Sequence, residues 1–99
     1  MTFGVIFSPE AQAQLLELYD YIADRAGPNV AIGYISRIEA YCRNFERFPE
    51  RGAKRDDIRL GLRTIGFERR VTIAFHIEPD AVVIDGMFYG GRDIEAALH

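Results

Sequence analysis

The chain has 99 residues, of which 48% are hydrophobic, and a formal net charge of −3. This is the length of one domain, and the hydrophobic content is too high for a chain that is disordered by composition. The single cysteine, Cys42, excludes an internal disulfide and a cysteine-based metal knuckle. No segment approaches the roughly 18 apolar residues that span a bilayer, so we expect a cytoplasmic protein.

Charge is unevenly distributed along the chain. Residues 1–42 carry a net charge of −3, residues 43–70 carry +4, and residues 71–99 carry −4. Proteins that bind the phosphates of RNA or DNA usually have a strongly positive net charge, because each neutralised phosphate releases counterions. Only the segment of residues 43–70 forms a basic patch here. Its cations are interleaved with the carboxylates of Asp56, Asp57 and Glu68. We therefore interpret the patch as a solvated surface.

The first half of the sequence predicts one strand and two helices. The apolar run Phe3–Phe7 indicates a strand, Ser8 a helix N-cap, and Gly27-Pro28 the end of the first helix. Asn29 is the expected N-cap of a second helix that stops at Phe48-Pro49, and the short linker predicts an antiparallel hairpin. Apolar residues recur at threes and fours on one face of each helix: Ala11, Leu15, Leu18, Ile22 and Ala26, then Ala31, Ile35, Ile38, Cys42 and Phe45.

The second half predicts three strands, Leu60–Phe67, Val71–Ile77 and Ala81–Tyr89, joined by two hairpin turns. Apolar and polar residues alternate in the middle strand, whereas the last strand begins with an apolar run typical of a strand covered on both sides. Residues Asp93–Leu98 are expected to form a helical turn or two. The order predicts a single α+β domain over residues 1–99. It comprises a strand, a two-helix antiparallel hairpin on one sheet face, a three-strand antiparallel meander and a short C-terminal helical tail.

Several short motifs follow the order found in the ParE branch of the ParE/RelE toxin superfamily, which this chain resembles. They are Ser8–Ala11 at the first helix, Tyr19–Ile22, the F-P-x-x-G turn Phe48–Gly52, Gly61–Arg63, and the closing motif Phe88–Asp93. In the closing motif many relatives carry histidine where this chain has Tyr89. The resemblance covers nearly the whole chain and implies a RelE/ParE-like fold.

The resemblance implies the toxin component of a type II toxin–antitoxin pair. A ParD-like antitoxin would hold it inactive in a hetero-oligomer by folding its C-terminal segment onto the toxin surface. ParE-type members inhibit DNA gyrase, while RelE-type relatives cut mRNA in the ribosome. Gyrase is therefore the implied target, with no cofactor and no metal. The alternative is a RelE-like ribosome-dependent mRNA endoribonuclease, and a third reading is a degenerate member that only binds its antitoxin.

Cleavage of RNA by 2′-hydroxyl attack needs a general base, a general acid and cations beside the phosphate. The side chains with suitable chemistry are Lys54, Arg63, His76, Tyr89 and Arg92. After Arg92 the only tyrosine or histidine is His99, and a chain end is a poor place to hold catalytic geometry. We therefore assign no catalytic residue and treat His76 as structural. We expect Arg63, Tyr89 and Arg92 to bind the target or the antitoxin.

Overall fold

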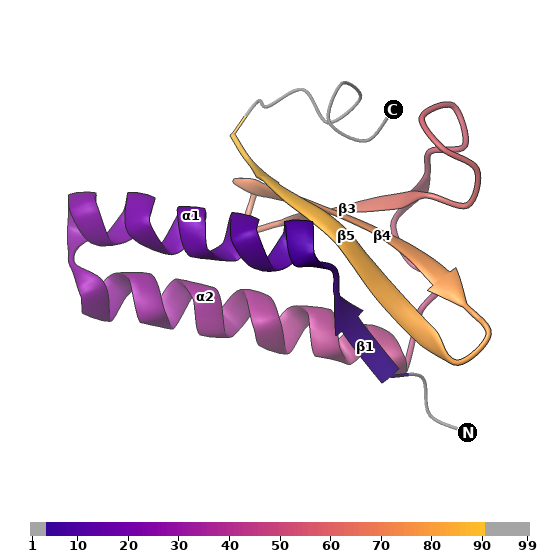
Figure 1. Ribbon diagram of the computed structural model, residues 1–99, viewed down its shortest axis with the longest axis horizontal. Coiled ribbons are helices and arrows are strands. Elements are labelled where there is room, and N and C mark those ends of the chain that lie inside the picture. Colours follow the sequence, from indigo (N-terminus) through magenta and orange to yellow (C-terminus); the bar gives the residue numbers. More distant parts are fainter. Residues whose placement is uncertain (1–3, 91–99) are drawn as a thin grey trace.

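The computed structural model describes residues 4–90, which form a helical hairpin on one face of a five-stranded sheet (Figure 1). The strand order is β1-β5-β4-β3-β2, with β1 parallel to β5 and the other neighbours antiparallel. This confirms the α+β class and the antiparallel meander, while the expected tail Asp93–Leu98 lies outside the described residues. The elements in chain order are β1 (Gly4–Phe7), α1 (Pro9–Ala26), α2 (Pro28–Arg43), the 3₁₀ helix η1 (Asn44–Glu46), β2 (Ala53–Lys54), β3 (Arg63–Phe67), β4 (Val71–Glu78) and β5 (Ala81–Tyr89).

Local signals set the limits of α1 as predicted. The Ser8 hydroxyl accepts a hydrogen bond from the backbone N–H of Ala11 at 3.1 Å, and Pro9 stands in the first helical turn. Gly27, with φ of 96°, ends α1 and also caps α2, so the predicted N-cap role of Asn29 is wrong. A glycine with positive φ reverses the chain within one residue, which leaves no room for a longer linker.

The second helix is shorter than the sequence pattern predicts. It ends at Arg43, and η1 carries the chain on to Glu46. This tighter turn places Phe45, which is 0% exposed, between the hairpin and the sheet. Its ring centroid lies 4.8 Å from that of Phe75 on β4.

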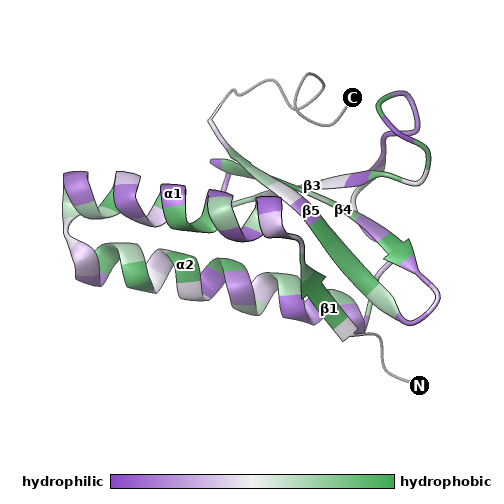
Figure 2. Cartoon of the chain, in the orientation of Figure 1, coloured by the Kyte–Doolittle hydropathy of each residue, from purple (hydrophilic) through white to green (hydrophobic). Residues whose placement is uncertain are grey.

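The main core fills the space between the helical hairpin and the sheet. Most of the predicted helical core residues are buried or half-buried there, including Cys42, whereas Ala26 is exposed where the hairpin extends beyond the sheet (Figure 1). Figure 2 shows a hydropathy pattern that agrees with this burial. Strand β5 is hydrophobic over most of its length, while both helices alternate between hydrophilic and hydrophobic residues. Within residues 4–90, neither helix offers an apolar stretch long enough to cross a bilayer.

A second, smaller core lies on the opposite face of the sheet. Ile58 and Leu62, from the connection between β2 and β3, pack there with Ala74 and Phe88. The sequence places Ala74 on the polar phase of β4, but this residue is fully buried because the connection covers it. The predicted start of β3 at Leu60 is also wrong: the chain is still turning there, and pairing with β2 and β4 begins at residue 63.

The last strand contains a bulge at Asp85. Ala74 pairs with Gly86 and Phe75 pairs with Ile84, so Asp85 has no partner on β4. The extra residue shifts the alternation of side chains, so that Ile84 and Met87 both pack in the main core. The carboxylate of Asp85 then reaches the opposite face of the sheet.

Candidate functional site

One of the predicted binding residues, Tyr89, lines a groove between α1 and the end of the sheet. Its ring centroid lies 5.1 Å from that of Tyr21 on α1, and its hydroxyl accepts a 3.4 Å hydrogen bond from Arg70 Nη1. The groove holds about 250 Å³ and has mostly apolar walls. Its lining residues are Gln14, Glu17, Leu18, Tyr21, Val71, Met87 and Tyr89. Apolar walls with polar tips at the rim suit one face of an amphipathic segment.

A second predicted binding residue, Arg63, is the half-buried first residue of β3. Its Nη1 donates to the backbone carbonyl of Arg51 at 3.3 Å. Lys54 on β2 lies directly opposite in the register. Among the described residues, no carboxylate forms an ion pair with either cation.

The structure does not bring Arg63 and Tyr89 together. Arg63 pairs with Phe75 on one side of β4, whereas Tyr89 pairs with Val71, four residues earlier in β4, on its other side. At about 3.3 Å per residue and 4.8 Å between strands, their backbones are about 16 Å apart. The third predicted residue, Arg92, lies outside the described residues. The described candidates therefore belong to two separate surfaces.

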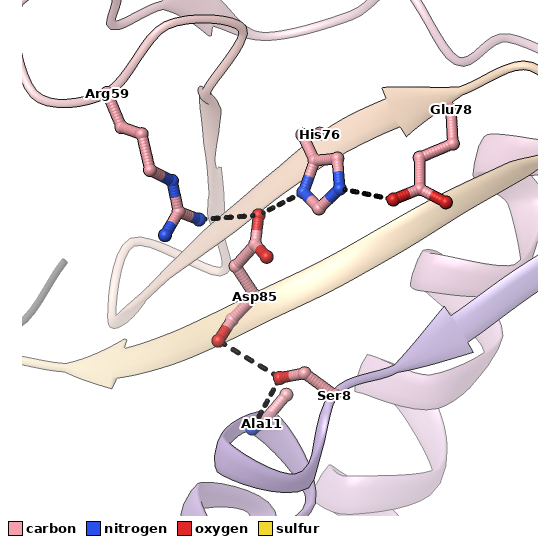
Figure 3. A network of polar contacts seen from close by, with 6 residues as sticks. All are labelled: Ser8, Ala11, Arg59, His76, Glu78 and Asp85. Carbon is pink, nitrogen blue, oxygen red and sulfur yellow. Dashed lines mark hydrogen bonds and ion pairs between the residues drawn. The ribbon is translucent and has the colours of Figure 1, made fainter.

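His76 lies in a polar network on the outer face of the sheet, which Figure 3 shows. Its Nδ1 is 2.7 Å from Asp85 Oδ2 and its Nε2 is 3.0 Å from Glu78 Oε2. Partial burial lowers the pKa of His76, but the hydrogen bonds and charges of the two carboxylates outweigh this, so the net pKa is raised. Both ring nitrogens are occupied, which is consistent with the predicted structural role.

The same network holds distant parts of the chain together. The Asp85 carboxylate also lies 3.3 Å from Arg59 Nη2, and the Asp85 carbonyl accepts a 3.2 Å hydrogen bond from the Ser8 hydroxyl. The bulge in β5 is thus tied to the start of α1 and to the loop after β2 (Figure 3). Asp85 is not among the candidate residues predicted from the sequence. An Asp-Gly pair inside an otherwise apolar strand is the signal that indicates such a bulge.

Two cations of the basic segment of residues 43–70, Arg55 and Arg59, pair with carboxylates of this chain, while Glu68 of that segment pairs with Arg37 on α2. Arg37 forms a two-point hydrogen-bonded pair with Glu68, at 2.9 and 3.1 Å. Hydrogen bonding to Arg37 lowers the pKa of Glu68. Arg55 pairs in the same way with Asp57, with both contacts at 2.9 Å.

The whole arrangement matches a known fold. A solved structure described as the chromosomal ParDE TA system from P. aeruginosa superposes with a TM-score of 0.78 and 21% sequence identity, over 89% of this chain and 96% of that chain. At this identity the likeness shows the fold, a strand and two helices on a mixed sheet. No curated protein sequence gives a significant match.

Family membership follows from the sequence match. Residues 5–93 match the family described as the ParE toxin of the type II toxin-antitoxin system, parDE. The chain therefore belongs to the ParE toxin family, and this membership implies an antitoxin of the ParD type as its partner.

Proposed function

We propose that this chain is a cytoplasmic toxin that acts by binding DNA gyrase, and that a ParD-like antitoxin holds it inactive in a hetero-oligomer. The observation that carries the proposal is the match of residues 5–93 to the ParE toxin family. The ParE-like motifs imply gyrase as the target class, because ParE-type members inhibit that enzyme.

The geometry of the candidate residues supports a binding role. Cleavage of one phosphodiester needs an acid, a base and a cation within a few ångströms of the same phosphate. Arg63 and Tyr89 are about 16 Å apart, and both nitrogens of His76 are engaged by carboxylates. These positions suit contacts with separate parts of a protein surface.

The groove beside Tyr89 supports the antitoxin as a partner. Two tyrosines at its edge, Tyr21 and Tyr89, have the amphipathic side chains that act as anchors in protein interfaces. An amphipathic segment that folds on binding can place apolar side chains along such a groove. We therefore assign the groove to the antitoxin.

The adjacent cations Lys54 and Arg63 favour the second candidate function, a RelE-like mRNA endoribonuclease. Two cations on neighbouring strands can hold one phosphate between them. This alternative predicts codon-dependent cuts in mRNA on translating ribosomes, whereas the gyrase proposal predicts none.

The two functions are separated by parallel assays of the purified toxin. We expect inhibition of gyrase supercoiling or trapping of cleaved DNA, relieved by an equimolar amount of the antitoxin, and no cuts in a toeprinting assay on translating ribosomes. Full supercoiling activity at a large molar excess of toxin would eliminate gyrase as the target. Codon-dependent cuts that disappear in Arg63→Ala would instead establish the endoribonuclease.

A further inference from the structure

The connection between β2 and β3, residues 55–62, is a closed loop with its own hydrogen bonds. At its base the N–H of Arg55 donates to the carbonyl of Leu62 at 2.8 Å. One residue further into the loop from each side, the N–H of Gly61 donates to Asp56 Oδ1 at 2.9 Å. A loop with such internal bonds keeps its shape without a partner, so binding through it costs little conformational entropy.

Two anchors fix this loop to the outer face of the sheet. Ile58 is 7% exposed and Leu62 is 0% exposed, because both are packed in the second core. The Arg59 guanidinium lies 3.3 Å from the carboxylate of Asp85, whose side chain is only 11% exposed (Figure 3). The position of the loop on the sheet is therefore determined by apolar packing and by an ion pair.

Leu60, in the second half of the loop, is 89% exposed, the highest value among the exposed large hydrophobic residues of the described chain. Removing a leucine side chain from water contributes about 1.5–3 kcal/mol. A convex apolar side chain on a preordered loop has the properties of an interface anchor that enters a pocket on its partner. A flexible segment has no preformed pocket, so the complementary partner is a folded protein.

The base of the same hairpin carries two positive charges that pair with no carboxylate of residues 4–90. Lys54 and Arg63 lie directly opposite one another on β2 and β3, where like charges are destabilising. The other two cations of the hairpin, Arg55 and Arg59, are paired with carboxylates of this chain. The base is therefore complementary to carboxylates that a partner supplies.

We propose that the hairpin of residues 53–64 is the surface by which the toxin binds its folded protein target. Leu60 enters an apolar pocket of the target, and Lys54 and Arg63, at the base of the hairpin, meet carboxylates of the same target. The identification of the target as gyrase rests on the proposed function. The groove beside Tyr89 is about 16 Å from Arg63 along the sheet, so the antitoxin and the target have different primary contacts.

Three variants of the full-length toxin test this inference by calorimetric titration against purified DNA gyrase and by growth arrest. We expect Leu60→Ser to weaken gyrase binding at least tenfold and to relieve growth arrest without changing the unfolding midpoint. Leu16→Ser is the matched control, since Leu16 is 68% exposed but lies on α1, and it should keep wild-type affinity.

The third variant, Lys54→Glu, separates a binding role from a structural one. It places opposite charges on β2 and β3, so we expect a higher unfolding midpoint together with at least fivefold weaker gyrase binding. Wild-type gyrase affinity in both Leu60→Ser and Lys54→Glu would overturn the hairpin inference and leave gyrase as the target.

Two further outcomes distinguish the inference from the proposed function. If the unaltered toxin does not bind gyrase, yet Leu60→Ser and Lys54→Glu both lose growth arrest, gyrase is the wrong target and the hairpin surface stands. If Lys54→Glu abolishes RNA cleavage while Leu60→Ser leaves growth arrest intact, the surface binds nucleic acid and the inference fails.

Discussion

Leu60 and Leu62 provide a matched test of the loop between β2 and β3, because they are two residues apart and differ in burial. Leu62 is 0% exposed and Leu60 is 89% exposed. Leu62→Ala removes three carbon atoms, each worth about 0.8 kcal/mol on transfer from water, and leaves a cavity in the second core. We expect it to cost about 3 kcal/mol of unfolding free energy. Leu60→Ala loses about a tenth of the transfer term, roughly 0.3 kcal/mol.

Urea unfolding followed by far-ultraviolet circular dichroism measures both losses, provided that the two variants keep the wild-type m-value. In a domain of this size, a loss of about 3 kcal/mol lowers the thermal midpoint by about 12–24 °C. A loss below about 1 kcal/mol for Leu62→Ala would refute the packing of the loop on β4 and β5. Equal losses for the two variants would refute it as well.

Three other predictions concern the rest of the fold. The contacts of protonated His76 stabilise the fold fully below about pH 6.5, the pKa of histidine in the unfolded chain. This stabilisation is lost as the pH rises through the raised pKa of His76 in the folded protein. The variant His76→Gln should therefore show a smaller decline of the unfolding midpoint between pH 6 and 9. Gly52 has φ of 76°, and in Gly52→Ala the added Cβ meets the carbonyl of Thr64. This variant should lose about 2 kcal/mol or more of unfolding free energy. Gly66→Ala is the control, because a Cβ at Gly66 meets open space, and it should change the unfolding free energy by less than about 0.5 kcal/mol. Burial raises the pKa of Cys42 to about 12, so iodoacetamide at pH 8 should modify the thiol only after the protein is unfolded in urea.

The first half of the fold is predictable because its signals are local. Ser8, Pro9 and Gly27 specify the limits of α1 through capping and φ preferences that need no tertiary partner. The limit of α2 is less predictable, since burial of Phe45 in the core converts its last expected turn into a 3₁₀ helix. Asn29 has the right chemistry for an N-cap, but Gly27 reverses the chain first.

The sheet edges and the candidate site depend on contacts that the sequence pattern does not encode. The two residues of β2 pair with β3 only because the loop between them closes on itself. The second core follows from that closure, and it buries Ala74 against the alternation of its strand. Similarly, the motif around Tyr89 leads to the prediction that this residue binds a partner, but its contact with Tyr21 depends on how α1 crosses the sheet.

The parallel pairing of β1 with β5 has a consequence for synthesis of the protein on the ribosome. The hydroxyl of Ser8 bonds to the carbonyl of Asp85, 77 residues later in the chain. At about 5–20 residues per second, roughly 4–15 s of translation separate these two residues. Both anchors that Asp85 and Phe88 provide for the loop at Leu60 are translated after the loop itself. A nascent or truncated toxin that lacks β5 therefore lacks both of these anchors, and the loop takes its final place on the sheet only after β5 has been synthesised.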